Sequence, residues 1–408
     1  MSGNGRQSIN RNKASMKHIV FIFAVAAAGL SPAAGEPLCA EERDALSFLD
    51  YVTGPLPAAE EKAWWTVGGG QYGIYSKRYN IAFAGYAAAA VGMRGDAEVT
   101  NRVGRILGNC VERMLKRDVW AYSQSKHYWG RRPWAPDPCY RENVMYTGHL
   151  LHLLALYEWF THDRRYWDKG FDFVWTPQQR VHYDVRRLID VTVEQMRAED
   201  NETGGVACEP NLIFFPCNNH QIYAFQLFSR LGYGDWSADA AKWEKWALAH
   251  YPGPVVGGGV IKFAYHKVTG MFYPRGSPGL DGWSLIWYEA WAHDRATALG
   301  LWKSAAACID WRLYADPSDE KAGSSCCDPL PVPASVAAAF LAAAARACDD
   351  PATAVRLEGP LDAKYLVHRP GRYYLDLDSN WRIGASAQRI ISLALSHGSS
   401  FRAMAFGH

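Results

Sequence analysis

This sequence of 408 residues has almost no excess of one sign of charge, because 43 lysine and arginine residues are balanced by 41 aspartate and glutamate residues. The formal net charge at pH 7 is +2, and the chain contains no long basic run. Proteins that capture nucleic acid or an anionic membrane by electrostatics concentrate lysine and arginine in a patch or stripe. We therefore expect no nucleic-acid partner.

An apolar run long enough to cross a membrane is also missing. A membrane-spanning helix needs about 20 consecutive apolar residues, whereas the N-terminal run IVFIFAVAAAGL covers residues 19–30. Lys13 and Lys17 precede this run and the small residues of SPAAG follow it, a pattern typical of a secretory signal peptide. We predict that residues 1–35 are this signal peptide, that the remaining chain has no stable membrane span, and that the protein is periplasmic or secreted.

Several catalytic motifs are absent. No GxSxG nucleophile elbow, phosphate-binding glycine loop or HExxH zinc motif occurs, so the sequence gives no support for the hydrolases, nucleotide-dependent enzymes or zinc proteases that use them. The glycine runs at 68–70 and 257–259 lack the lysine of a phosphate loop. Structural zinc sites usually combine two tightly spaced ligand pairs, which this sequence does not contain, and we predict no metal site.

Segments with the alternation of strands are scarce, and helical spacing dominates. YLVHR and YYLDL, within residues 365–377, are the best strand candidates and predict a hairpin around PGR. Pro- and Gly-rich turns separate the predicted helices, which favours an all-α helical-pair toroid in a single domain, residues 36–408. The predicted helices cover residues 41–53, 80–93, 97–115, 141–160, 184–197, 219–231, 237–250, 283–300, 302–311, 333–348 and 385–397.

The stretch ACEPNLIFFPCNNH, residues 207–220, places two cysteines nine positions apart around an apolar run. A disulfide between Cys208 and Cys217 is one interpretation, since an exported protein meets an oxidising compartment. The apolar spacer suits the wall of a greasy pocket, and the chain has nine cysteines, an odd number that leaves at least one thiol unpaired. A buried thiol keeps a high pKa unless a charged partner lowers it, so catalysis here would need an acid or base elsewhere.

Three other residues are candidates for chemistry, although each taken alone is at least as well explained by packing or exposure. His149 lies in an apolar helical segment, where Gly148 would allow a ligand or another backbone to approach closely. Asp50 shares the apolar side of ALSFLDYVT, and a buried carboxylate is costly unless it is paired or functional. Tyr79 begins another apolar helix, where its phenol could donate to a ligand oxygen.

Together these segments resemble the linalool dehydratase/isomerase family. The specific matches are CEPNLIFFPCN at 208–218 and ENVMYTGHL at 142–150, and the shorter ones are RYNIAF at 78–83, FLDYV at 48–52 and YHKVTG at 265–270. The resemblance implies an (α/α)6 barrel with a cofactor-free active site in a hydrophobic channel. It also implies a homo-oligomer, by resemblance a pentamer, and a periplasmic location.

The reaction that the resemblance implies is reversible dehydration of a tertiary allylic, monoterpene-like alcohol to its diene, with isomerisation to the primary alcohol. The partner would therefore be a small hydrophobic alkenol. Site residues follow from the matched motifs. The implied catalytic residues are Cys208, Cys217, His149, Asp50 and Tyr79, and the implied substrate-binding residues are Met145, Phe214 and Trp287.

This chemistry needs a proton on the leaving oxygen and a base for the adjacent methyl group. Our hypothesis is that Tyr79 and His149 hold the hydroxyl, and that Asp50 and Cys208 supply the leaving-group proton. Cys217 would act as the base at the other end of the allyl system. A covalent thioether formed on a cysteine is an alternative.

The sequence also departs from the family pattern. A family tyrosine that follows the Asp50 segment has no counterpart in GPLPAAE, another aligns with Trp287, and extra residues stand between His149 and Cys208.

Two other classes of function compete with the dehydratase. One is an exported glycan-active lyase or glycosidase, which would need two suitably spaced carboxylates from among Glu142, Glu209 and Asp50. The other is a non-enzymatic lipophile-binding protein with a Cys208–Cys217 disulfide.

Overall fold

The computed structural model describes residues 37–65, 77–121, 136–316, 333–378 and 381–407, all within the unit Ala34–His408. The predicted signal peptide lies outside the described residues. Among the helices that are described, none combines the length and the apolar character needed to cross a bilayer.

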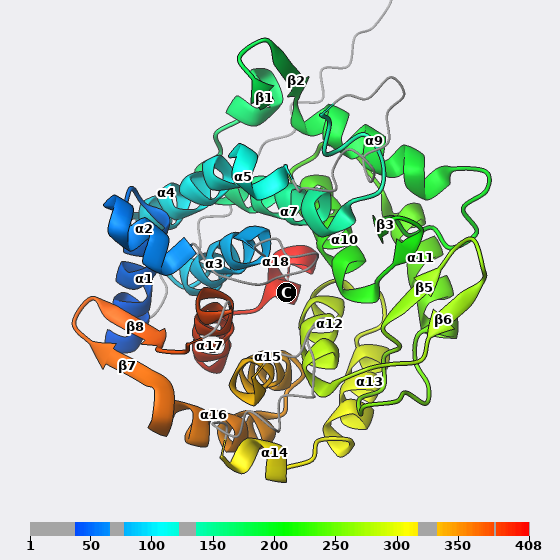
Figure 1. Ribbon diagram of the computed structural model, residues 1–408. Helices are drawn as coiled ribbons and strands as arrows, with labels where there is room; N and C mark the ends of the chain where they lie inside the picture. The colour runs from blue at the N-terminus through cyan, green and yellow to red at the C-terminus, as the bar shows by residue number, and fades with distance from the viewer. Residues whose placement is uncertain (1–36, 66–76, 122–135, 317–332, 379–380, 408) are drawn as a thin grey trace, which may run out of the picture. The chain divides into compact units, whose positions relative to one another are not determined.

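Six of the described helices form a closed inner ring (Figure 1). Each packs against the next in the order α3, α7, α10, α12, α15 and α17, and α17 returns to α3. Their mostly apolar or small side chains are buried on nearly all sides, as expected for helices that are hydrophobic all round. The inner helices are α3 (Lys77–Gly92), α7 (Val144–Thr161), α10 (Phe215–Arg230), α12 (Pro278–Trp291), α15 (Ala334–Ala347) and α17 (Arg382–Ser396).

A second set of helices surrounds this ring and packs against it with one face (Figure 1). In α4 the buried residues, among them Val103, Leu107 and Val111, recur at helical spacing, so the opposite face is left to solvent. The outer helices are α1 (Ala40–Thr53), α4 (Ala97–Met114), α9 (Val185–Arg197), α11 (Ser237–His250), α13 (Arg295–Ala307) and α16 (Pro351–Tyr365). This arrangement confirms the predicted (α/α)6 barrel.

The described strands are short and form three antiparallel sheets. The sheets contain β1 (Phe171–Thr176) and β2 (Gln179–Tyr183); β3 (Ala207–Glu209), β4 (Leu212–Ile213), β5 (Ala264–His266) and β6 (Met271–Tyr273); and β7 (Leu366–Arg369) and β8 (Arg372–Leu375). Short helices complete the described part: α2 (Ala58–Trp65), α5 (Arg117–Trp120), α8 (Arg165–Asp168), α14 (Arg312–Ala315) and α18 (Phe401–Phe406).

The C-terminal helix α18 lies near the centre of the ring (Figure 1). It packs against α10 and α12. The Phe401 carbonyl accepts a hydrogen bond of 2.8 Å from the Tyr223 hydroxyl, and the Phe401 ring lies 4.7 Å from that of Trp287. The end of the chain therefore contributes an aromatic side chain to the middle of the barrel.

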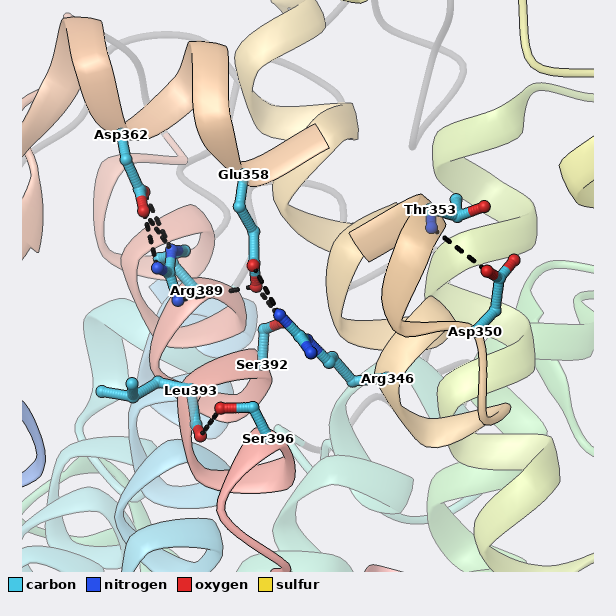
Figure 2. A network of polar contacts seen from close by, with 9 residues as sticks. All are labelled: Arg346, Asp350, Thr353, Glu358, Asp362, Arg389, Ser392, Leu393 and Ser396. Atoms are coloured by element: carbon cyan, nitrogen blue, oxygen red, sulfur yellow. Dashed lines mark hydrogen bonds and ion pairs between the residues drawn. The ribbon is translucent and has the colours of Figure 1, made fainter. Parts of the chain in front are cut away.

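Buried ion pairs join α15, α16 and α17 (Figure 2). Arg389 holds Asp362 through two short contacts, Nη2–Oδ2 at 2.6 Å and Nε–Oδ1 at 2.8 Å. Glu358 accepts from Arg346 at 2.9 Å and from Ser392 at 2.5 Å. Each carboxylate in this contact thus has a cationic partner, which a largely buried charge requires.

Most predicted helices are confirmed, and the exceptions have identifiable causes. The predicted helices 283–300 and 302–311 are wrong in their division: α12 ends at Trp291, and Asp294 caps a new helix, α13, which ends at Ala307. Helix α16 is missing from the predicted helices; Pro351 occupies its first turn, where proline is favoured, and Pro360 lies inside it. The predicted hairpin at 365–377 is confirmed as β7 and β8.

Candidate functional site

The two motif cysteines lie on different elements and meet inside the barrel. Cys208 is in β3 and Cys217 is in the first turn of α10. Both are buried free thiols, and their Sγ atoms lie 3.1 Å apart, within hydrogen-bonding distance. A disulfide would bring the two sulfurs to about 2.05 Å, so the pair is present as two neighbouring thiols.

The environment of Cys208 keeps its thiol protonated. Burial, the hydrogen bond to Cys217 and the nearby Glu209 raise the pKa of Cys208 well above its ordinary value, and the positive charge of Arg78 opposes them only in part. A protonated thiol can donate a proton, whereas nucleophilic attack needs the thiolate. Cys208 is therefore a thiol, which has a proton to give and is not a nucleophile in this form.

A glycine allows α7 to approach the cysteine segment. A Cβ atom on Gly148 would lie 3.2 Å from the Cys217 carbonyl oxygen and 3.5 Å from the Gln221 amide nitrogen. Of the two explanations that the sequence left open, the close approach of another backbone is the one that the structure bears out. His149 follows directly, and its ring centroid is 3.9 Å from that of His220 on α10.

Three histidines gather between α7 and α10, and all three are fully buried. Burial lowers the pKa values of His149, His152 and His220 well below the ordinary value, so all three imidazoles are neutral at pH 7. Tyr86 Oη lies 2.8 Å from His149 Nδ1. The Trp283 indole donates to His220 Nε2 at 3.1 Å, and His220 Nδ1 lies 3.2 Å from His152 Nδ1.

Two ring nitrogens of this histidine cluster have no hydrogen-bond partner among the described residues. Among the described residues, neither His149 Nε2 nor His152 Nε2 has a hydrogen-bond partner, although both are buried. A buried polar atom without a partner costs about 1–3 kcal/mol, and binding of a ligand is one of the ways in which that cost is offset. These two nitrogens are therefore candidates for contact with a substrate.

Aromatic side chains enclose the histidine cluster. The Tyr79 ring lies 5.3 Å from that of His149 and 5.1 Å from that of Trp283. The Trp287 ring lies 4.8 Å from both Tyr86 and His152. The structure thus places Tyr79 against His149, and Trp287 against Tyr86 and His152, in one buried cluster.

Arg78 lies beside this cluster, and the hypothesis from the sequence did not include it. It is almost completely buried, its guanidinium lies 4.4 Å from the centre of the Tyr79 ring, and its Nη2 lies 3.3 Å from the Met145 sulfur. Its charge acts on His149 and on Cys208, which ties the histidine cluster to the cysteine pair. The signal in the sequence was an arginine immediately before the apolar run of α3.

Of the remaining predicted site residues, Met145 and Phe214 are buried in the core, whereas Asp50 lies on an outer helix. Met145 contacts Arg78, and Phe214 is buried directly before α10 with its ring 4.9 Å from Phe263. Asp50 lies on the outer helix α1, where Arg105 binds both of its oxygens, at 3.1 and 2.6 Å, and Arg102 lies 3.4 Å away. Within one chain, the structure does not bring Asp50 to the histidine cluster.

Three of the matched sequence segments meet beside the site. Glu142, just before α7, pairs with Lys267 at 3.4 Å and accepts from the Asn211 amide at 3.3 Å, and the Lys267 amide donates to the Asn211 carbonyl at 2.9 Å. Glu142 and Asn143 both have a positive φ, 54° and 61°, which is uncommon for residues other than glycine. These contacts hold the start of α7 in a fixed position relative to the cysteine segment.

Cys39, Glu42 and His397 form a group whose ligand atoms are close enough for one metal ion, the single such group among the described residues. However, Glu42 already accepts from the Cys39 amide and pairs with Arg94, in a capping box that begins α1. We assign this group to helix capping.

A pocket of about 440 Å³ opens on the described surface between α1, α2 and α4. Thr53, Asn109 and Lys116 are among its lining residues, and none of the predicted site residues lines it. This pocket is therefore separate from the histidine cluster.

Comparison with known proteins gives both a family and a fold. The family model described as linalool dehydratase/isomerase matches residues 78–364. The unsaturated glucuronyl hydrolase of Bacillus sp. GL1 is 14% identical, with a TM-score of 0.50 over 88% of this chain and 97% of that one. A polysaccharide lyase is 12% identical, with a TM-score of 0.50 over 86% of this chain and 97% of that one. At these identities the two structures indicate the shared barrel alone.

Proposed function

Because this chain belongs to the linalool dehydratase/isomerase family, we propose that it is an enzyme that interconverts a tertiary allylic alcohol, its diene and the isomeric primary alcohol. The observation that carries this proposal is the pair of buried thiols, Cys208 and Cys217, with their sulfurs 3.1 Å apart. The pair is joined to neutral His149 through the close contact of α7 and α10 at Gly148. The substrate would be small, hydrophobic and monoterpene-like.

The proposed dehydration consists of three proton transfers. Cys208 gives its thiol proton to the hydroxyl oxygen, the C–O bond breaks, and water leaves with the bonding electron pair. The Cys208 thiolate takes the Cys217 proton across the contact between the two sulfurs, and the Cys217 sulfur then removes a proton from the methyl group of the allyl cation. Both thiols are restored, and the net change is alcohol to diene and water.

Return of water at the other end of the allyl system would give the primary alcohol. Tyr79 and His149 hold the hydroxyl in this scheme. Asp50 is left out of it within a single chain, because Arg102 and Arg105 already bind its carboxylate.

The aromatic side chains support a cationic intermediate. Aromatic faces attract cations, by about 2 kcal/mol or more where water is excluded, and Tyr79, Trp283 and Trp287 are all buried around the histidines. Exclusion of bulk water would also protect the cation from premature capture. Met145 and Phe214 would add apolar surface.

The test is anaerobic incubation of the purified protein with linalool, geraniol and shorter tertiary alkenols, with gas chromatography for the diene. We expect turnover by the wild-type protein, a loss of at least 100-fold in Cys208→Ser and Cys217→Ser, and no change in Cys308→Ser, whose thiol is exposed. Absence of turnover of every alkenol by folded protein would contradict the proposal, as would full activity of Cys217→Ser.

The glycan-active alternative has weaker support. A glycosidase needs two carboxyl groups about 5–10 Å apart that face its cleft. Of the three candidates, Glu142 is paired with Lys267 and Asp50 with two arginines. Glu209, beside Cys208, therefore has no second carboxylate of that set to act with. The histidine cluster is lined by aromatic rings rather than carboxylates. Hydrolysis or elimination of an unsaturated glucuronide by the purified protein would favour this alternative.

The location and the assembly are further parts of the proposal. Export to the periplasm should appear as a mature N-terminus near Glu36 in mass spectrometry of the protein from its host. A homo-oligomer should appear in sedimentation velocity as a species several times the mass of one chain.

A further inference from the structure

Tyr86 is a buried residue to which the proposed function gives no role. It lies on α3, seven residues after Tyr79, and its side chain is inaccessible to solvent. Its ring stacks on His152 at 4.1 Å and on His220 at 5.3 Å, and its hydroxyl reaches His149 Nδ1 at 2.8 Å. The question is which of these two groups donates the proton.

The hydrogen-bond inventory of the cluster answers this question. If His149 Nδ1–H donated to Tyr86, the phenolic proton would lack an acceptor among the described residues, and the lone pair on His149 Nε2 would also remain unused. If Tyr86 donates to Nδ1, the only group left without a partner is His149 Nε2–H. Since each buried unsatisfied group costs about 1–3 kcal/mol, the second arrangement is favoured.

The other two histidines follow the same logic and serve as an internal reference. The Trp283 indole is a donor only, so His220 Nε2, at 3.1 Å, must accept. Neutral His220 then carries its proton on Nδ1 and donates to His152 Nδ1 at 3.2 Å. His152 is left with its proton on Nε2, which is the second buried nitrogen without a partner.

We propose that Tyr86 is a positioning residue, which fixes His149 with its proton on Nε2 so that the imidazole donates a hydrogen bond to the oxygen of a bound alcohol. This role rests on the proposed function for its substrate, but the tautomer itself does not. It also assigns His149: the residue is a hydrogen-bond donor to the leaving hydroxyl and not the base that removes the methyl proton.

Nitrogen NMR of the full chain labelled with ¹⁵N-histidine tests the tautomer without any activity measurement. At pH 8 protonated and bare ring nitrogens resonate far apart, and His149→Asn identifies the His149 signals. We expect bare Nδ1 and protonated Nε2 for His149. The opposite pattern would overturn the proposal, whether or not any alkenol is turned over.

Tyr86→Phe tests the positioning role. The variant should lose the single tautomer of His149 and lower kcat about 10- to 100-fold with little change in KM. Tyr146→Phe is the matched control, since it also removes a buried phenol with a hydrogen bond of 2.8 Å, here to the Met114 carbonyl, and should change neither readout. An unchanged His149 tautomer in folded Tyr86→Phe would overturn the role of Tyr86.

A saturated tertiary alcohol, tetrahydrolinalool, provides a measurement on the wild-type protein in case Tyr86→Phe does not fold. It cannot form an allyl cation, so it should bind without reacting and shift the His149 Nε2–H signal. Binding without any change at that signal would overturn the contact between His149 and the alcohol, and leave the tautomer assignment standing on its own result.

Discussion

Two sides of the inner ring treat buried polar groups in opposite ways. Between α15, α16 and α17 the carboxylates of Asp362 and Glu358 are matched by Arg389 and Arg346 (Figure 2), although Gln388 and the Nε atom of Arg346 have no partner among the described residues. Around His149, His152 and His220 the polar side chains are neutral apart from the nearby Arg78, and two imidazole nitrogens have no partner among the described residues. The first arrangement holds helices together, whereas the second leaves hydrogen-bonding capacity unused.

The difference shows how one barrel can supply both stability and a candidate site. The cost of burying a charge is offset when an oppositely charged group pairs with it. The ion pairs therefore favour one way of packing α16 on the ring. An unsatisfied buried imidazole lowers stability, and a bound alcohol that accepts its hydrogen bond would offset that loss. We therefore expect the two sides to respond differently to pH and to substitution.

The largest expected effect is acid destabilisation from the histidine cluster. Burial depresses the pKa values of His149, His152 and His220, so their contribution to stability is present above about pH 6.5 and is lost as the pH falls below it. Each histidine contributes a slope of up to about 1.4 kcal/mol per pH unit. Between pH 7.5 and pH 5.5, urea unfolding should show that the wild type loses several kcal/mol more than a variant in which all three histidines are replaced by asparagine.

The ion pairs between α15, α16 and α17 should lose their contribution to stability only at a lower pH than the histidines. Burial tends to raise the pKa of Glu358, but Arg389, Ser392 and Arg346 together lower it below its ordinary value. Its contribution is therefore present above about pH 4.5 and is lost only below that. A triple His→Asn variant that keeps the acid sensitivity between pH 7.5 and pH 5.5 would refute the separation of the two sides.

The second largest expected effect is the loss of stability when one partner of a buried ion pair is removed. Arg389→Ala leaves Asp362 without its guanidinium and removes one of the two arginines beside Glu358. Breaking a buried pair from one side typically costs about 3–5 kcal/mol, and we expect about 3 kcal/mol by urea unfolding because Asp362 is partly exposed. Arg312→Ala, at a pair whose arginine is 90% exposed, should cost less than about 1 kcal/mol. Equal losses in the two variants would contradict the buried role of Arg389.

Asp281 on α12 gives an intermediate case, a fully buried carboxyl held by backbone amides. Its oxygens accept from Val260 and Ile261 at 2.7 and 3.0 Å, and burial raises its pKa to about 8. The folded state therefore prefers the protonated form, and stability is lost as the pH rises from about 4 through 8. The unfolding free energy of the wild type, relative to Asp281→Asn, should fall by about 1.4 kcal/mol per pH unit within that window. A pH-independent difference would show that Asp281 is ionised in the folded protein.

Local pattern predicted the helices and the motif residues, but not how distant segments combine. The apolar spacing of α7 and α10 indicated both helices, and the matched motifs indicated His149, Cys208 and Cys217. Tyr86 and His220 had no such signal, because their rings come together only when α3 and α10 both pack against α7 in the folded ring. A tyrosine in an apolar helix is usually a packing residue, and no spacing rule distinguishes one that binds a histidine 63 positions away.

The smallest expected effect concerns Asp50, the predicted site residue that the structure places apart. Its ion pairs with Arg102 and Arg105 are partly exposed, with the arginines 39% and 56% accessible, so Asp50→Asn should lower the free energy of unfolding by less than about 1 kcal/mol. Arg105→Ala should cost a similar amount, and the double variant little more, because both changes remove the same contact.

The assay for alkenol turnover then separates the two interpretations of Asp50. A residue that serves only the contact of α1 with α4 leaves turnover within about twofold of wild type in both variants. A loss of 100-fold in Asp50→Asn alone, with stability retained, would mean that the carboxylate reaches the substrate after all and that the sequence motif, rather than its place on the outer helix, identified its role.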